Sequence, residues 1–152
     1  MSNADGGPTF SAPHVIEYSY RRSVGTVLGH FFGELRERRI VGIRRLDGAV
    51  LVPPTEADPE SGETLGEFVS VGPSGVVTTW AWVRAPSAKH PCDRPFAWAL
   101  IRLDGADSAL LHAVDAGRES VMSTGMRVRP RWRRETEGSI LDIECFEPEE
   151  AS

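Results

Sequence analysis

The sequence offers few candidates for a nucleophilic catalytic site, because a nucleophile and a base are rarely neighbours in it. Cys92 follows His90 by two residues, and this loop is the one place where a nucleophile and a base are neighbours in sequence. A cysteine nucleophile needs a base within hydrogen-bond reach, and a third group normally orients that base. No neighbouring residue would orient His90, so we assign no catalytic residue to the chain.

The other histidines and cysteines show no spacing that is typical of a metal site. His14, His30 and His112 are scattered along the sequence, and a structural role is expected for His112 within a strand. Cys145 lies in an apolar stretch and is expected to be a small buried residue. Two distant cysteines make no disulfide framework, which favours a reducing, cytoplasmic setting, and a single bridge between them stays open.

A group of arginines and tryptophans makes nucleic-acid binding a second possible function. Residues 126–133 alternate strictly, with four arginines on one face, and three tryptophans lie on nearby strands: Trp80, Trp82 and Trp98. OB barrels can bind single-stranded nucleic acid with such aromatic and cationic surfaces. Against this, the formal net charge is −5, and the arginines can pair with Asp142 and Glu144 across the strands. Nucleic-acid binding is therefore kept only as an alternative.

These residues belong to a series of strand-like segments that is organised around residues 68–83. Two apolar runs flank the turn cluster Gly72-Pro73-Ser74-Gly75, and the second run is rich in β-branched and aromatic residues. Further runs with turn signals between them follow at 96–103, 109–114, 126–133 and 139–146. This pattern predicts a mainly β fold with a five-stranded barrel, the oligonucleotide/oligosaccharide-binding (OB) type being the first choice.

The segments before the barrel predict an arm, a helix and a hairpin. Residues 14–20 alternate like an edge strand or an arm that lies on a partner, and Ser23 is expected to cap an amphipathic helix over residues 24–38. A hairpin is expected around the turn dipeptide Asp47-Gly48.

The length of 152 residues fits one domain with an appendage, and no apolar run reaches the roughly 20 residues that span a membrane. The expected organisation is a disordered tail or tag, then arm, helix and ribbon, then barrel, then a short tail: 1–13, 14–63, 64–148 and 149–152.

The order of these segments resembles the DUF35 proteins, an acyl-CoA-associated OB-fold family with an N-terminal helix and a rubredoxin-like zinc ribbon before the barrel. The resemblance spans residues 24–148. It is carried by HFFGELRERRI, GAVLVPP, GPSGVVTTWAWV, RPFAWALIRLDG, LLHAVDAG, GMRVRPRW and ILDIECFEP. Each motif alone is weak, and their order and spacing make the match specific.

The resemblance also implies a zinc site whose ligands this chain lacks. The family carries two Cys-x-x-Cys pairs, and the four ligand positions correspond here to Arg44, Asp47, Asp58 and Ser61. A structural zinc requires thiolate or imidazole ligands, and an arginine brings a permanent cation to the same place. We therefore expect a degenerate ribbon without zinc and without a bound cofactor, in which Arg44 pairs with Asp47 or Asp58.

Functionally, the resemblance implies a companion of an enzyme. DUF35 proteins accompany thiolase-like enzymes, sterol-carrier-type thiolases and related aldolases, and some associate with hot-dog-fold acyl-CoA hydratases. The expectation is a non-catalytic subunit of a hetero-oligomer that acts on acyl-CoA, in lipid or steroid side-chain degradation. The alternatives are a single-stranded nucleic-acid-binding protein, a stand-alone acyl-CoA-binding protein, and an enzyme that uses Cys92 and His90.

Under this expectation, the contacts with acyl-CoA or a partner come from one loop and from aromatic residues. The loop residues are Arg84, Lys89, His90 and Arg94, whose cations can meet a CoA phosphate that arrives with the partner. The aromatic residues are Phe31, Phe32, Trp80 and Trp82, a residue class enriched at interfaces. The competing interpretation is that the loop cations are only solvated and the aromatic residues belong to the core.

Overall fold

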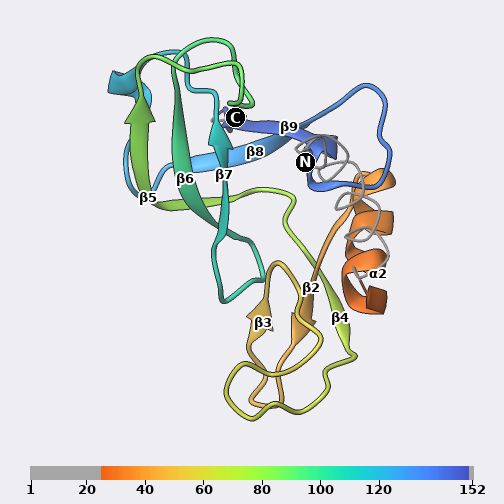
Figure 1. The fold of residues 1–152 in the computed structure, drawn as a ribbon. Coiled ribbons are helices and arrows are strands. Elements are labelled where there is room, and N and C mark those ends of the chain that lie inside the picture. Colours follow the sequence, from red (N-terminus) through yellow and green to blue (C-terminus); the bar gives the residue numbers. More distant parts are fainter. Residues whose placement is uncertain (1–24, 151–152) are drawn as a thin grey trace, which may run out of the picture.

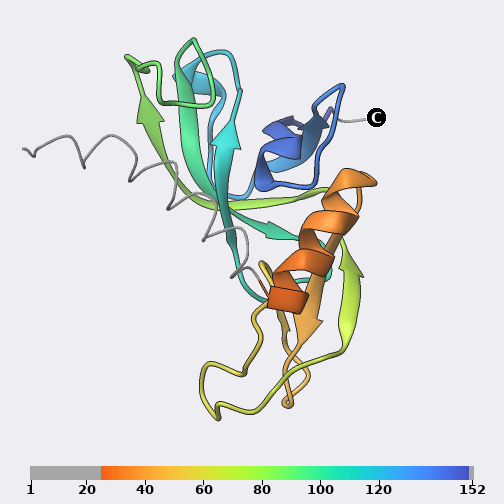
Figure 2. The same ribbon diagram turned by 45° about the vertical axis from the view of Figure 1, so that its right-hand side comes forward.

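The computed structural model describes residues 25–150, which form a closed barrel, a smaller sheet and a helix (Figure 1). The helix lies along one side of the smaller sheet, and the barrel lies beyond the end of that sheet (Figure 2). The mainly β fold class, with a five-strand barrel of OB type and a preceding helix, is confirmed. The expected tail over residues 1–13, the arm over 14–20 and the cap at Ser23 lie outside the described residues.

The barrel contains the last five strands, hydrogen-bonded in the closed order β5-β6-β7-β9-β8. Their bounds are β5 Gly75–Val83, β6 Phe96–Leu103, β7 Leu110–Val114, β8 Arg127–Trp132 and β9 Ile143–Pro148. All neighbours are antiparallel except β7 and β9, which run parallel and meet at Val114 and Phe146. One parallel pair therefore closes the barrel.

The barrel interior follows from the alternation along the strands. In β6, Ala97, Ala99, Ile101 and Leu103 are buried, and the residues between them are half-buried or exposed. Because successive side chains of a strand point to opposite faces, this period places one apolar row inside the barrel. Small residues occupy two of these places, which leaves room for Phe146 from β9, also fully buried.

The smaller sheet has the order β3-β2-β4, with bounds β2 Ile40–Arg44, β3 Val50–Leu51 and β4 Phe68–Val71. The hairpin expected around Asp47-Gly48 joins β2 to β3 and is confirmed. β4 lies in the region assigned to the barrel, and it pairs instead with β2. The chain then passes directly into β5, where Gly75 is required because a Cβ there would approach the carbonyl oxygen of Arg102 to 2.6 Å.

Helix α2 spans Gly25–Arg36, slightly less than the predicted 24–38, and covers the smaller sheet with three buried residues. The carboxylate of Glu56 accepts the backbone N–H of Val27 at 3.0 Å, so a distant loop supplies the acceptor for the first turn. At the other end Arg38 adopts a left-handed conformation with φ 61°. Its backbone N–H and that of Arg39 bond back to Leu35 and Glu34, which closes the helix end.

The segment before β9 differs from the prediction. The sequence predicts a strand over residues 139–146, but residues Ile140–Asp142 form a short 3₁₀ helix, η3, and Leu141 is exposed. Ser139 caps η3, and Asp142 accepts three backbone N–H groups, those of Glu137, Gly138 and Ser139, at 2.8 to 3.1 Å. This carboxylate therefore holds the loop before β9, and it does not pair with the arginines of β8. A second 3₁₀ helix, η2, spans Glu119–Val121.

Candidate functional site

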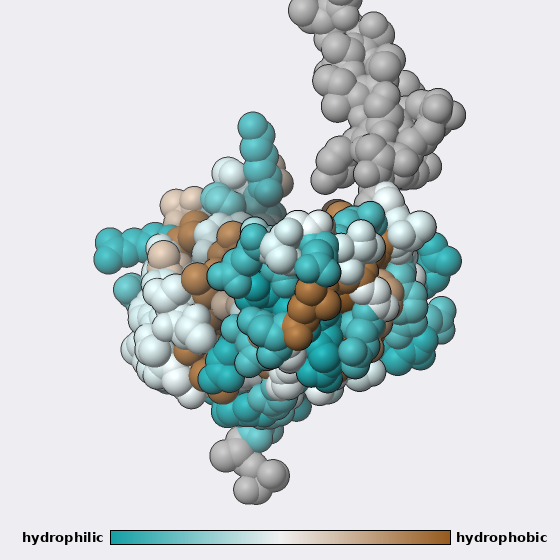
Figure 3. Space-filling view, turned by 90° about the horizontal axis from the view of Figure 1, so that it is seen from below, coloured by the Kyte–Doolittle hydropathy of each residue, from teal (hydrophilic) through white to brown (hydrophobic). Residues whose placement is uncertain are grey.

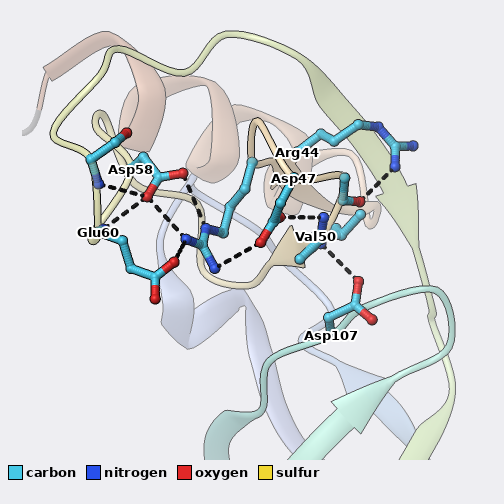
Figure 4. A network of polar contacts seen from close by, with 10 residues as sticks. Arg44, Asp47, Val50, Asp58, Glu60 and Asp107 are labelled. Carbon is cyan, nitrogen blue, oxygen red and sulfur yellow. Dashed lines mark hydrogen bonds and ion pairs between the residues drawn. The ribbon is translucent and has the colours of Figure 1, made fainter.

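The four positions at which the resembled family carries zinc ligands do not converge as a set. Arg44 donates from Nε to Glu67 Oε2 at 3.0 Å, so the expected pairing of Arg44 with Asp47 or Asp58 is wrong. The next residue, Arg45, holds the central place instead. Three carboxylates converge on its guanidinium (Figure 4), those of Asp47, Asp58 and Glu60.

The strongest member of this ion-pair cluster is the pair of Arg45 and Asp58. It is bidentate, with Nε–Oδ2 and Nη2–Oδ1 both 3.1 Å, and the Asp58 side chain is only 4% exposed. Asp58 Oδ1 also accepts the backbone N–H groups of Glu60 at 2.8 Å and Ser61 at 3.2 Å, which fixes its own turn. The hydrogen bonds from Arg45, followed by the one from Glu60, lower the pKa of Asp58 to about 2.

These residues do not fit a structural zinc. Within residues 25–150 no group of three His, Cys, Asp or Glu side chains is arranged to hold a metal ion. The guanidinium of Arg45 lies among the carboxylates, and a second cation in the same place would be repelled.

The end of the molecule seen from below in Figure 3 is mainly hydrophilic, with hydrophobic residues in small separate spots.

The predicted contact loop, residues 84–95, covers a cavity of about 500 Å³ at the side of the barrel. Its most buried charged residue is Asp115, whose side chain is 4% exposed. Asp115 Oδ2 accepts hydrogen bonds from Arg94 at 2.6 Å and from Arg131 at 3.2 Å. Burial raises the pKa of Asp115, but the two guanidinium groups outweigh it and hold that pKa below its ordinary value. Arg94 is thus tied to a buried carboxylate of its own chain.

The remaining oxygen of that carboxylate, Asp115 Oδ1, is buried and has no hydrogen-bond partner among residues 25–150. A buried acceptor of this kind normally has a donor, so a water or a ligand N–H or O–H would find a place there. Arg131 also donates to Glu144 at 2.8 Å, so its guanidinium is shared between two carboxylates of the cavity wall.

His90 and Cys92 both line this cavity and do not form a catalytic pair. His90 Nδ1 accepts the backbone N–H of Ser87 at 2.8 Å, and its ring lies edge-on to Phe96. Burial, followed by the charge of Asp115, raises the pKa of Cys92, which disfavours its thiolate. Cys145 is fully buried in the same small cluster, and burial raises its pKa to about 12. Both thiols are free.

The other predicted contact residues divide between surface and core. Arg84 and Lys89 are exposed, and neither forms an ion pair with another residue of the described part. Phe31 is 1% exposed and belongs to the core, which corrects its assignment as a contact residue. Phe32, Trp80 and Trp82 are half-buried and pack against the main core cluster.

The arginine face of β8 is largely neutralised by carboxylates of the same chain. Arg127 binds Asp104 through two hydrogen bonds of 2.7 and 2.8 Å and also contacts Glu149. Arg129 pairs with Glu147 at 3.1 Å. Because phosphate binding needs cations that are not already compensated, this face is a weak candidate for nucleic acid. The expected pairing with Glu144 is found, through Arg131.

Sequence reasoning missed Arg45 and Asp115, the two residues around which the charged groups gather. Asp115 follows β7 directly, and its partners come from a loop and from another strand, so no local spacing marks it. A signal for η3 was present, because Ser139 and Asp142 have the spacing of a capping box.

Comparisons with known proteins agree with this architecture. Residues 68–133 match the family model described as ChsH2, C-terminal OB-fold domain. A chain of the structure named Ltp2-ChsH2(DUF35) aldolase is similar with a TM-score of 0.60 and 20% identity, over 83% of this chain and 97% of that chain. A DUF35-family protein of unknown function from Sulfolobus solfataricus is similar with a TM-score of 0.59 and 19% identity, over 82% and 90%.

At these identities the structural likeness establishes the fold, and the family model covers β4 and the barrel strands β5 to β8. None of the curated proteins compared with the chain matches it. Among the described residues, no helix has the length and apolar character that a membrane crossing requires. The resemblance that the sequence indicates is confirmed for the barrel.

Proposed function

We propose that this chain, whose barrel is an OB-fold domain of the DUF35 type, is an accessory subunit of a thiolase-superfamily enzyme that acts on acyl-CoA. The partner, a thiolase or a retro-aldolase, supplies the catalytic residues, and the barrel lies beside it in a hetero-oligomer. The CoA thioester reaches this chain through the partner, and the chain carries no zinc or other cofactor of its own. Lipid or steroid side-chain degradation in the cytoplasm is the setting that we propose.

The observation that supports this proposal most directly is the likeness to the DUF35 chain type in an aldolase. The match covers 97% of the chain in the structure named Ltp2-ChsH2(DUF35) aldolase, so it includes more than the barrel alone. The family model that matches residues 68–133 carries the same ChsH2 name. Fold alone does not determine function, and the proposal must therefore also agree with the chemistry of the site.

The geometry around Cys92 and His90 agrees with a subunit that leaves the chemistry to its partner. A nucleophilic cysteine would need a lowered pKa and an oriented base. Here the pKa of Cys92 is raised, and the Nδ1 atom of His90 is occupied by the backbone N–H of Ser87. Among the charged residues, Arg94 and Arg131 are committed to Asp115.

The contact surface for the partner is best sought at loop 84–95. Arg84 and Lys89 are its exposed cations without ion-pair partners in the described chain, and they are free to meet carboxylates or phosphates. The opposite end of the molecule offers only small hydrophobic spots on a hydrophilic surface (Figure 3). A partner that needs an apolar contact would find little there.

The test is co-expression of the chain with the thiolase-superfamily protein encoded nearest to it, followed by size-exclusion chromatography. We expect one co-eluting complex, and we expect the partner to be more active or more soluble with the chain than without it. A hot-dog-fold acyl-CoA hydratase is the second partner to include in the same assay. Separate elution with unchanged activity and solubility of every partner would contradict the proposal.

Charge-reversal variants locate the contact. The double variant Arg84→Glu and Lys89→Glu should weaken the complex roughly tenfold or more, because rim charges steer and stabilise association. Arg102→Glu is the matched control, because Arg102 is also exposed and lies at the end of β6 away from loop 84–95. If both variants bind the partner with equal affinity, loop 84–95 is not part of the interface, although the complex itself still forms.

A further inference from the structure

Loop 84–95 covers part of the outer barrel wall and is attached to that wall by few polar contacts. Among the described residues its hydrogen bonds are internal, such as those between Ser87 and His90, with one exception. The exception is the hydrogen bond from Arg94 to Asp115 at 2.6 Å. The position of the loop therefore depends mainly on the apolar contacts beneath it.

Those contacts form a small apolar cluster that is separate from the main core. Phe96, Ala113 and Cys145 are fully buried in this cluster. Phe96 alternates with the inward row of β6, and Ala113 lies opposite Trp98, so both point to the outside of the barrel. Residues on an outer wall are buried only where another segment covers them. Loop 84–95 is that segment, because its Cys92 packs against the cluster.

The cluster brings together the two cysteines of the chain, which are far apart in sequence. Cys92 belongs to the loop, and Cys145 belongs to strand β9 in the wall that the loop covers. Both thiols are free. Burial is the main cause that raises the pKa of Cys145 to about 12, and the nearby thiol of Cys92 adds to it. One thiol from the covering segment and one from the covered wall therefore lie in the same small cluster.

The two thiols differ in their access to solutes. Cys92 is half-buried and lines the cavity of about 500 Å³ under the loop, whereas Cys145 is fully buried and does not line it. Arg131, the residue of β8 that pairs with Cys145, also lines this cavity, so the cavity reaches the strand pair that carries Cys145. A small oxidant in the cavity would meet Cys92 first.

We propose that Cys92 and Cys145 form a reversible disulfide bond, which locks loop 84–95 onto the barrel wall when the chain meets a peroxide. In the first step the Cys92 thiolate takes one oxygen from the peroxide and becomes a sulfenic acid, S–OH. The Cys145 thiolate then attacks the Cys92 sulfur, the S–S bond forms, and the S–O bond breaks with loss of hydroxide. Over both steps the two thiols lose two electrons to hydrogen peroxide. The peroxide and the two thiol protons end as two molecules of water.

Such a bond would differ in kind from a structural disulfide. In a reducing compartment a disulfide is transient and responds to oxidants, and it returns to two thiols when the oxidant is removed. The bond uses only residues of this chain, so the inference does not depend on the proposed function.

The test is oxidation of the full chain with hydrogen peroxide, followed by intact mass and a count of free thiols. Mildly alkaline pH is suitable, because burial raises the pKa of Cys92 and keeps its thiolate scarce at neutral pH. We expect a monomer that has lost both thiols and two hydrogen atoms, and dithiothreitol should restore it. Because the chain contains two cysteines, this monomer identifies the bond between Cys92 and Cys145. Its melting temperature should be higher by about 5 °C or more, since the bond closes a long loop.

Single variants separate the two steps of the reaction. In Cys145→Ala the oxidised Cys92 finds no second thiol, so its sulfenic acid should accumulate and be trapped by dimedone. The unchanged chain should give little of this adduct under the same conditions. In Cys92→Ser the buried Cys145 should remain a free thiol. The mass of the unchanged chain tests the bond even if either variant folds poorly.

Hydrogen exchange measures the effect of the bond on the loop. In the oxidised chain the amides of loop 84–95 should exchange more slowly than in the reduced chain. The amides of the β2–β3 turn, which lies outside the cluster, serve as the internal control and should exchange at an unchanged rate.

Three results would overturn the inference. The first is retention of both thiols after exposure to peroxide. The second is a sulfinic acid on Cys92 while Cys145 stays a thiol. The third is a disulfide between two copies of the chain as the main product. None of these results bears on the partner complex of the preceding subsection, which is assayed with reduced protein.

Discussion

Arg45 joins two turns that are far apart in sequence, the β2–β3 turn and the turn that begins at Asp58. The bidentate contact closes one side, and the carboxylates of Asp47 and Glu60 complete the ring around the guanidinium. A group that must reach two turns at once needs several donors in a fixed plane, and arginine supplies them. A lysine at the same position would provide one point charge and could not hold both oxygens of Asp58.

Acid should loosen this ion-pair cluster. Because the folded pKa of Asp58, about 2, lies below its ordinary value of 3.8, its contribution to stability is complete above the ordinary value and is lost as the pH falls toward about 2. The melting temperature of Asp58→Asn should therefore lie below that of the unchanged protein at neutral pH, and the gap should close as the pH falls through this window. Circular dichroism melts over a pH series measure both.

Asp93→Asn is the matched control, because Asp93 is exposed and takes part in no ion pair of the described chain. A gap of constant size down to the acid limit would contradict the assignment. A chelator should leave the melting temperature unchanged, since we propose that Arg45 and not zinc holds these turns. One zinc per purified chain by elemental analysis would show that proposal to be wrong.

At the scale of elements, the C-terminal end of α2 departs from the usual preference for glycine because of a contact with a distant loop. Glycine usually occupies the left-handed position after a helix, yet Arg38 stands there with φ 61°. Its guanidinium donates to the carbonyl oxygens of Arg133 at 3.1 Å and Arg134 at 2.8 Å. The strained backbone thus places a side chain that ties α2 to the loop before η3.

Two substitutions at Arg38 should separate strain from contact. Arg38→Ala keeps the unfavourable conformation and loses the hydrogen bonds, so we expect a loss of about 1–2 kcal/mol in the free energy of unfolding. Arg38→Gly loses the same bonds but relieves about 1 kcal/mol of strain, so it should be clearly more stable than the alanine variant. Urea unfolding measures the difference, with Glu37→Ala as the neighbouring control. Equal stability of the two variants would show that the backbone there is not strained.

The elements themselves were largely predictable. Periodicity indicates the helix to within a few residues, turn dipeptides indicate the hairpin at Asp47-Gly48, and alternating apolar runs indicate the barrel strands. The element that differs, η3, forms because of competition from local hydrogen bonding. Residues 139–142 alternate like a strand, but the Ser139 hydroxyl and the Asp142 carboxylate bind the backbone N–H groups that a strand would have used.

For the whole molecule, pairing between distant segments was the part that the sequence could not supply. β4 and β5 are adjacent in sequence and flank a turn cluster, yet they belong to different sheets. Which strand pairs with which depends on contacts between distant segments. The residues of one segment do not show which other segment it will pair with. The same reason hides Asp115, whose ligands come from two other segments.

The two sheets are joined by a contact that resembles one more strand pairing. The carboxylate of Asp107 accepts the N–H of Val50 at 2.8 Å, and the N–H of Asp107 donates to the carbonyl of Val50 at 2.8 Å. Ser108 repeats this exchange at Val52 with its hydroxyl alone. The turn after β6 therefore completes the free edge of β3.

Asp107→Ala should leave the buried N–H of Val50 without an acceptor and reduce the free energy of unfolding by about 1–2 kcal/mol. Asp107→Asn keeps an acceptor oxygen and should lose less. Hydrogen exchange should show faster exchange in β3 for the alanine variant and unchanged exchange in β6 and β7. Protection of β3 equal to that of the unchanged protein, or a matching loss in Asp93→Ala, would contradict this role.

Loop 84–95 and the turns held by Arg45 lie at opposite ends of the molecule (Figure 1). The strand path through Gly75 connects those ends without a flexible linker, because β5 follows β4 after a turn that is hydrogen-bonded to the residues after β6. An enzyme that bound both ends would have to extend along the whole length of the chain. An enzyme that bound only one end would leave the other end exposed to a third protein.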